Sequence, residues 1–113
     1  MIEQQIKTIS VQEFKKRMDE SKTICLIDVR EADEWQSIRI PGAMHIPKDQ
    51  LLNLIATTVP NRDQTIYLHC RGGVRSMYAA GRLLEIGYTD VYSLDGGIVE
   101  WENAGYPVLK QSS

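Results

Sequence analysis

Short apolar runs alternate along this chain with segments that have helical periodicity. Ile24–Ile27 and Thr65–His69 are too short for buried helices and are typical of strands. Two further strands are expected at Met44–Ile46 and Asp90–Leu94. Strands separated by helices usually run parallel, because the connecting helix carries the chain back to the same edge of the sheet. We therefore expect an α/β fold: an open, mainly parallel sheet with helices on both faces.

Helix-starting and helix-ending signals lie between these runs. Ser10 followed by Glu13 is the pattern of a capping box, which places a helix start at Val11. The longest periodic segment begins at Met77 and ends before Gly87, a residue suited to the C′ position of a helix. Shorter helices are expected near residues 32–35, 51–55 and 98–103.

The composition limits the class of protein and its partners. The chain has 113 residues, 42% of them hydrophobic and 25% charged, which suits a single domain over residues 1–113 with a frayed tail at 111–113. A net charge of −2 gives no bulk attraction to nucleic acid or to a membrane surface. No stretch approaches the roughly 20 apolar residues of a membrane span, and the N-terminus lacks the pattern of a secretory signal. A cytoplasmic protein is therefore expected, and a monomer is the default because the sequence carries no signal of the oligomeric state.

The chain contains two cysteines and two histidines. Two cysteines are too few for a disulfide scaffold, and the spacing of the cysteines and histidines is not that of a metal site. We expect no metal and no other cofactor. Cys25 lies in an apolar run and is interpreted as a core residue, with a role as resolving thiol for Cys70 as the alternative.

Cys70 differs from Cys25 because a glycine-rich turn and a helix follow it. Backbone N–H groups of such a turn can surround the sulfur, and the positive end of a helix favours the nucleophilic thiolate. Arg71 and Arg75 of the turn form, together with Arg82, a local positive cluster suited to small anions. The site predicted here comprises Cys70, Arg71, Gly72, Gly73, Val74, Arg75 and Ser76. In open α/β sheets, ligands bind at the carboxyl ends of strands, where this turn would lie.

Residues of the turn are expected to have different roles. Arg71 would point outward and hold the anionic end of a substrate by forked hydrogen bonds. Arg75 would fold back over the turn and add positive charge. Ser76 is expected to be the N-cap of the following helix. Gly72 and Gly73 would permit the backbone angles and the close approach that the turn requires.

Charged and polar residues also stand at the ends of two predicted strands. Asp28 and Arg30 are interpreted as structural anchors held by ion pairing. His69 precedes Cys70 directly, which suggests a general base. Because side chains alternate across a strand, its ring should face away from the thiol, so a structural role is favoured.

Four segments, in this order and spacing, resemble the rhodanese (thiosulfate sulfurtransferase) homology domain. They are Asp28-Val29-Arg30-Glu31, Ile40-Pro41-Gly42-Ala43 leading to Ile46-Pro47, the loop from Cys70 to Ser76, and Leu94-Asp95-Gly96-Gly97-Ile98 with Trp101 beyond. The resemblance covers roughly residues 6–108, the expected core of the domain, and implies a five-stranded sheet. One departure is visible: Ile38-Arg39 stands where the family often has Gly-His.

The resemblance implies a sulfurtransferase that works through a persulfide on Cys70. Sulfane sulfur would pass from thiosulfate or a persulfide donor to a thiol or cyanide acceptor. The N–H groups of residues 71–76 would stabilise the negative terminal sulfur. Small sulfur anions and thiols are therefore the expected partners, with a sulfur-relay protein as a further one.

Three other functions remain as alternatives. A persulfide carrier that docks on a partner protein would use the same chemistry at Cys70. A cysteine-dependent phosphatase has a similar loop, but the loop here is one residue shorter, because only residues 71–74 separate Cys70 from Arg75. The smaller loop suits one sulfur atom better than a phosphate group. A regulatory module that only binds is disfavoured by the presence of the cysteine.

Overall fold

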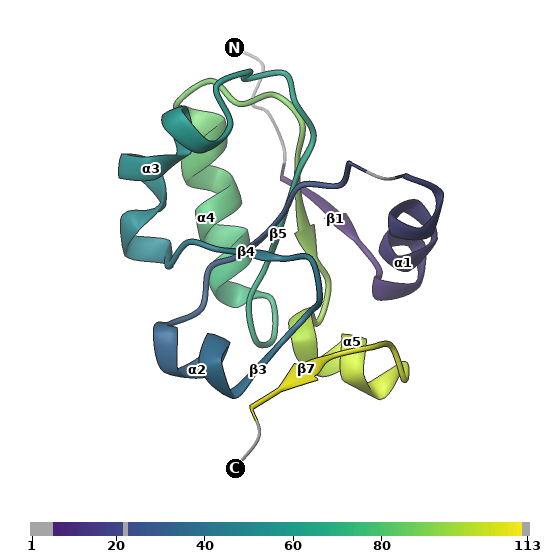
Figure 1. The fold of residues 1–113 in the computed structure, drawn as a ribbon. Coiled ribbons are helices and arrows are strands. Elements are labelled where there is room, and N and C mark those ends of the chain that lie inside the picture. The colour runs from purple at the N-terminus through teal and green to yellow at the C-terminus, as the bar shows by residue number, and fades with distance from the viewer. Residues whose placement is uncertain (1–5, 22, 112–113) are drawn as a thin grey trace.

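The computed structural model describes residues 6–21 and 23–111. Its elements are β1 (Lys7–Ile9), α1 (Val11–Glu20), β2 (Leu26–Asp28), α2 (Ala32–Ser37), β3 (Ile38–Arg39), β4 (Met44–His45), the 3₁₀ helix η1 (Lys48–Gln50), α3 (Leu51–Thr58), β5 (Ile66–His69), α4 (Val74–Glu85), β6 (Val91–Leu94), α5 (Gly97–Asn103) and β7 (Leu109–Lys110). Within the described ranges, five strands form a parallel sheet in the order β1-β6-β5-β2-β4 (Figure 1). The predicted α/β architecture is thus confirmed.

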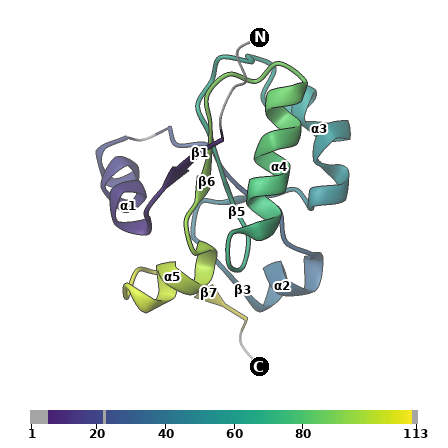
Figure 2. The ribbon, with the colours of Figure 1, turned by 180° about the vertical axis from the view of Figure 1, so that it is seen from behind.

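Helices cover both faces of the sheet. α3 and α4 lie on one side, and α1 and α5 lie on the other (Figures 1 and 2). Each face has its own apolar core, because successive side chains of a strand point to opposite faces. In β5, Ile66 and Leu68 pack in the core beneath α3 and α4, whereas Tyr67 packs in the core beneath α1 and α5. The strand signals thus identified segments that are buried on both faces.

One edge of the sheet was predicted and the other was not: β4 lies within the strand expected at Met44–Ile46, whereas β1 was missed. The sequence patterns located no strand before residue 24, yet β1 pairs with β6 and places Ile9 beside Leu94. β1 has three residues, of which only Ile9 is buried, so no apolar alternation could develop. β1 is held by its pairing with β6 and not by a local signal.

A second, antiparallel pair joins β3 to β7, with Ile38 opposite Lys110 and Arg39 opposite Leu109. Its first strand is the Ile38-Arg39 segment that departs from the family pattern. The Gln111 N–H donates to Ser37 O at 3.0 Å, so the prediction of fraying was wrong for Gln111. Ser112 and Ser113 lie outside the described residues.

The helix caps agree with the sequence signals at several ends. Ser10 Oγ accepts a hydrogen bond from the Glu13 N–H at 3.1 Å, and Gly87, which follows the C-cap residue Ile86 of α4, has a φ of +99°. α4, however, begins at Val74 and not at Met77, and the Met77 side chain is partly exposed. None of the helices in the described ranges is long and apolar enough to cross a bilayer.

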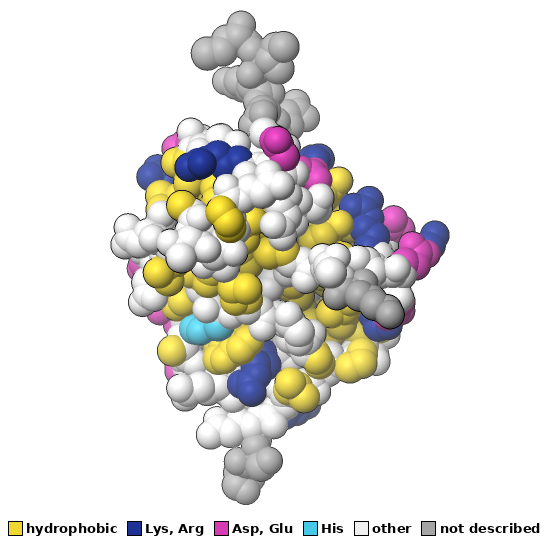
Figure 3. Space-filling view, turned by 45° about the horizontal axis from the view of Figure 1, so that its top comes forward, with side chains coloured by type: hydrophobic (Ala, Val, Ile, Leu, Met, Phe, Trp, Pro, Cys, Tyr) yellow, Lys and Arg dark blue, Asp and Glu magenta, His cyan; other side chains and the backbone are white. Residues whose placement is uncertain are grey.

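Surface charge is mixed in sign. On the face shown in Figure 3, basic and acidic side chains are interspersed among apolar ones and form no large patch of one sign. In the described part of the chain, no three His, Cys, Asp or Glu side chains gather where they could hold a metal ion.

Candidate active site

The loop that begins at Cys70 leaves the carboxyl end of β5, the central strand of the parallel sheet. β5 lies between β2 and β6, so the ends of these parallel strands bring their polar residues to the same edge. Asp28 ends β2, and Ser93 lies near the end of β6. The predicted location at the carboxyl ends of the strands agrees with this topology.

The sulfur of Cys70 lies at the bottom of the loop. Cys70 is 1% exposed, and its Sγ accepts a hydrogen bond from the Gly73 N–H at 3.1 Å. Gly73 has a φ of +110°, in the left-handed region that favours glycine, and is the N-cap of α4. The turn therefore directs one backbone donor at the sulfur just before the positive end of a helix.

Glycine is required at only one of the two adjacent positions of the turn. At Gly72 the φ is not positive, and a Cβ atom would have no neighbour within 4 Å. Gly72 and Gly73 were expected to permit the backbone angles of the turn, and only Gly73 adopts the left-handed conformation that favours glycine.

The N-terminus of α5 supports the loop from the other side. The Ile98 N–H donates to Cys70 O at 3.0 Å, and the Val99 N–H donates to Arg71 O at 3.1 Å. This approach requires glycine at position 97, where φ is +56° and a Cβ atom would lie 2.4 Å from Cys70 O. Gly97 was named from the sequence only as part of a family segment, and the contact that requires glycine there is tertiary.

Ser76 is not the N-cap of α4, which corrects the sequence-based expectation. The helix already begins after Gly73, and Ser76 is buried in its first turn. Its Oγ donates to Gly73 O at 3.1 Å, lies 2.7 Å from Ser93 Oγ and 3.6 Å from Cys70 Sγ. The hydroxyl thus connects the loop, the helix and β6 around the sulfur.

Arg75 extends to α2 and forms a forked ion pair there. Its Nη1 and Nη2 lie 2.6 and 2.9 Å from Glu34 Oε1 and Oε2. These hydrogen bonds lower the pKa of Glu34 to about 2, helped by the Glu31 N–H that donates to Oε1. Arg75 was expected to add positive charge to the loop. This expectation was wrong, because the carboxylate of Glu34 neutralises the charge of Arg75.

The other two arginines of the predicted cluster lie apart. Arg71 is exposed next to Cys70 and lines a pocket. Arg82 is two turns beyond Arg75, about 10 Å along the helix axis, and its guanidinium lies 3.6 Å from Glu85. The predicted cluster of three arginines does not form, because the helix carries Arg82 away from the loop.

Asp28, Arg30 and His69 form a buried polar cluster beneath the loop. Arg30 Nη2 lies 2.8 Å from Asp28 Oδ2, and Arg30 Nε donates to both carboxylate oxygens. The His69 ring lies between two acceptors: its Nδ1 is 3.2 Å from Cys70 O, and its Nε2 is 3.4 Å from Asp28 Oδ2. Burial lowers the pKa of His69, so the ring is neutral near pH 7 and its contacts are those of a structural residue.

Cys25 and Cys70 stand near opposite ends of the sheet. The register places Leu26 opposite Tyr67, so Cys25 lies beside Ile66, about 13 Å from Cys70 along the strands. The alternative role of Cys25 as a resolving thiol is therefore wrong for this fold.

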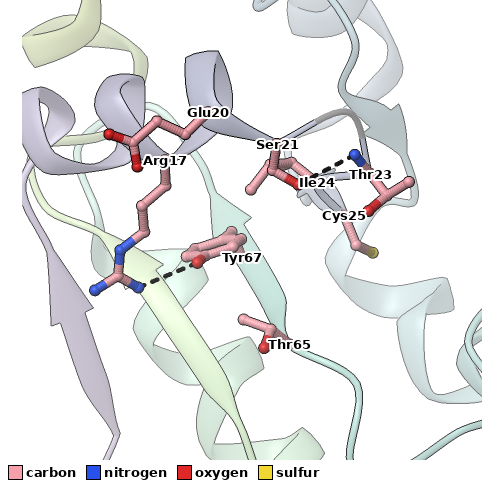
Figure 4. A pocket seen from close by; sticks show the side chains of 8 residues that line it. All are labelled: Arg17, Glu20, Ser21, Thr23, Ile24, Cys25, Thr65 and Tyr67. Carbon is pink, nitrogen blue, oxygen red and sulfur yellow. Dashed lines mark hydrogen bonds between the residues drawn. The ribbon is translucent and has the colours of Figure 1, made fainter.

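Cys25 is half-buried and borders a pocket of about 340 Å³ that also contains Arg17 and Tyr67 (Figure 4). In this pocket Arg17 donates to Tyr67 Oη at 3.1 Å. Burial raises the pKa of the Cys25 thiol, which disfavours its nucleophilic form.

Comparison with known proteins agrees with this geometry. The sequence model of the family described as Rhodanese-like domain matches residues 10–104. The chain belongs to the rhodanese-like domain family. The resemblance inferred from the four sequence segments is thereby confirmed.

Among its relatives, this rhodanese-like domain is 33% identical over 88 residues to "Thiosulfate sulfurtransferase GlpE" of Shewanella oneidensis, which covers 78% of this chain and 85% of that protein. It is 35% identical over 100 residues to "Probable adenylyltransferase/sulfurtransferase MoeZ" of Mycobacterium tuberculosis, covering 88% of this chain but only 26% of that protein. The solved rhodanese-like domain protein of Staphylococcus aureus has a TM-score of 0.74 and 32% identity, covering 96% of this chain and 100% of that chain. Both of these curated relatives are named as sulfurtransferases.

Proposed function

We propose that Cys70 is the nucleophile of a sulfurtransferase that takes sulfane sulfur from thiosulfate or a persulfide donor. The observation that carries this proposal is the Gly73 N–H, 3.1 Å from Cys70 Sγ, in a turn that leads into the N-terminus of α4. A backbone donor and a helix terminus both favour an anionic sulfur at this place.

In the first step, the Cys70 thiolate attacks the outer sulfur of thiosulfate. A new S–S bond forms, the S–S bond of thiosulfate breaks, and sulfite leaves with its electron pair. In the second step, a thiolate or cyanide attacks the terminal sulfur of the Cys70 persulfide. The bond to Sγ then breaks, and its electron pair regenerates the Cys70 thiolate. No external oxidant or reductant is needed.

The first turn of α4 would stabilise the negative charge during both steps. The first N–H groups of a helix have no acceptor within the helix, so those of Val74 and Arg75 are available to the terminal sulfur. Donors held in place by the fold need no reorganisation when charge develops. Cys70 is 1% exposed, so the part of a substrate that approaches Sγ must be narrow, as the terminal sulfur of thiosulfate or of a persulfide is.

Intact-mass measurement after incubation with thiosulfate tests the proposal. Wild-type protein should gain the mass of one sulfur atom, and Cys70→Ser should gain none. Cys25→Ser is the matched control and should gain sulfur like the wild type. Uptake by Cys70→Ser, or none by the wild type with either thiosulfate or a small persulfide donor, would refute the role of Cys70. Hydrolysis of an aryl phosphate without sulfur uptake would instead favour the phosphatase alternative.

A persulfide carrier for a sulfur-relay protein is the second candidate. Apolar side chains adjoin the loop on the first turns of α4, where Val74 is 82% and Tyr78 is 57% exposed. Such surface is suited to contact with a protein. Rapid loading by a persulfide donor combined with negligible loading by thiosulfate would favour the carrier over the thiosulfate enzyme.

A further inference from the structure

A pocket of about 390 Å³ lies beside the Cys70 loop, within the size range of small-molecule sites. One wall comes from α2 and the other from α5, and Arg71 belongs to the loop itself. The lining side chains used below are Arg30, Asp33, Glu34, Arg71 and Glu102. Because the N-terminus of α5 is hydrogen-bonded to Cys70 O and Arg71 O, the pocket is fixed relative to the sulfur.

Two of these charged side chains are already compensated by partners. Arg30 is buried and bound to the carboxylate of Asp28 through its Nε and Nη2. Glu34 is bound through both oxygens to Arg75. Neither pair offers a free charge to a ligand, because the Arg30 pair is buried and the Glu34 pair is forked through both carboxylate oxygens.

The remaining charges are one cation, Arg71, and two anions, Asp33 and Glu102, and all three residues are exposed. Over residues 6–21 and 23–111, no ion pair involves Arg71 or Asp33. Glu102 lies 3.8 Å from Lys110 Nζ, but both side chains are well exposed, so this pair is weak. The available charge of the pocket is therefore −1, with both signs present.

This arrangement disfavours a small dianion and suits a ligand that carries both charges. A dianion such as thiosulfate is attracted by Arg71 but repelled by two carboxylates nearby. Building on the function proposed above, we propose that the pocket selects an amino-acid-type thiol as sulfur acceptor. Its carboxylate binds Arg71, and its ammonium group binds Asp33 and Glu102.

The transfer needs no further reactant. The thiolate of the bound acceptor attacks the terminal sulfur of the Cys70 persulfide, and a new S–S bond forms on the acceptor. The bond between Cys70 Sγ and the terminal sulfur breaks, and Sγ leaves as a thiolate. The product is the persulfide of the amino-acid-type thiol.

Three thiols test the selectivity after the protein has been loaded with thiosulfate. Cysteine carries both charges, 2-aminoethanethiol carries only the ammonium, and 3-mercaptopropionate carries only the carboxylate. The loaded mass is verified first, so a failure of the proposed function appears at this stage. The rate constant for loss of the extra sulfur is then measured with each thiol, and each variant is compared with the wild type for the same thiol.

The double variant Asp33→Asn/Glu102→Gln should lower the rate constants with cysteine and 2-aminoethanethiol by about three- to tenfold, the range of one or two exposed ion pairs. It should raise the rate constant with 3-mercaptopropionate. Arg71→Gln should lower the rate constants with the two carboxylate-bearing thiols only. Glu100→Gln, an exposed substitution on α5 outside the pocket lining, should change none of them.

Two results with the double variant would overturn the inference. One is a rate constant that changes by the same factor with all three thiols; the other is unchanged rate constants with both cysteine and 2-aminoethanethiol. In both cases normal loading by thiosulfate would leave the proposed function intact.

Discussion

At the scale of single residues, two glycines determine the shape of the loop around Cys70. Gly73 adopts a φ of +110° and directs its N–H at the sulfur. Gly97 allows the backbone of α5 to approach Cys70 O and Arg71 O, which a Cβ atom would meet at 2.4 and 2.5 Å. The constraint at Gly97 is the more severe, because backbone atoms cannot move aside as the end of a flexible side chain can.

Gly97→Ala tests this steric constraint. Its matched control is Gly105→Ala, which also has a positive φ (+80°) but no neighbour within 4 Å of the added Cβ. The control should lose about 1–2 kcal/mol of stability from the left-handed conformation alone. Gly97→Ala should lose about 1–3 kcal/mol more from overpacking and should take up sulfur more slowly. Urea unfolding and loading rates measure both effects, and equal stability losses in the two variants would contradict the steric explanation.

At the scale of elements, α2 depends on its contacts with the Cys70 loop. α2 has six residues, none of them buried, and so short a helix is not stable by itself. Its capping box joins Glu31 to Glu34, and the forked pair of Glu34 with Arg75 joins α2 to the first turn of α4. One carboxylate therefore both caps a helix and holds the loop arginine.

Glu34→Gln should reduce stability in a pH-dependent way. The pKa of Glu34 is about 2 in the fold and about 4.3 in an unfolded chain, so its contribution is fully present above the unfolded value. It is lost as the pH falls toward 2. After discounting for partial exposure, we expect a loss of about 1 kcal/mol at pH 7. Urea unfolding of both proteins from pH 7 to pH 3 should show the difference shrinking below about pH 4.3; a constant difference would contradict this role.

At the scale of the whole molecule, the buried cluster of Asp28, Arg30 and His69 lies between the sheet and the site. Arg30 also donates to Ile38 O, and so connects the end of β2 with β3. His69 lies between Asp28 and the Cys70 carbonyl, both of which are acceptors, and its Nε2 has no hydrogen-bond partner within the described structure. A neutral ring can donate to only one of the two acceptors, and burial opposes the second proton.

His69 should therefore make the stability of the protein depend on pH. Its pKa is lowered by burial, so the unfolded chain binds a proton that the folded chain resists. Stability is full above the unfolded value of about 6.5 and falls as the pH decreases, by at most about 1.4 kcal/mol per pH unit. Urea unfolding between pH 7.5 and 5 should show a shallower slope for His69→Asn than for the wild type. Parallel slopes would contradict the prediction.

Much of the molecule was predictable because its signals are local. The apolar runs that became β2 and β5, the Ser10 cap and the Gly87 end each depend on neighbours within a few positions. The Cys70 loop was also recognisable, since the residues that form it are consecutive. β1 and the β3–β7 pair were missed, because their residues do not belong to an apolar run and the strands are held by partners far away in the chain.

By itself, the amino-acid sequence determined the family, the parallel α/β architecture and the loop that surrounds Cys70. Only the tertiary structure decided that Glu34 neutralises Arg75, 41 positions away, that Ser76 is buried against Ser93, and that Cys25 lies too far from Cys70 to meet it. It also brought Asp33, Arg71 and Glu102 around one pocket. The physical reason is that caps, turns and periodicity act between near neighbours, whereas ion pairs and pockets form between residues that only packing brings together.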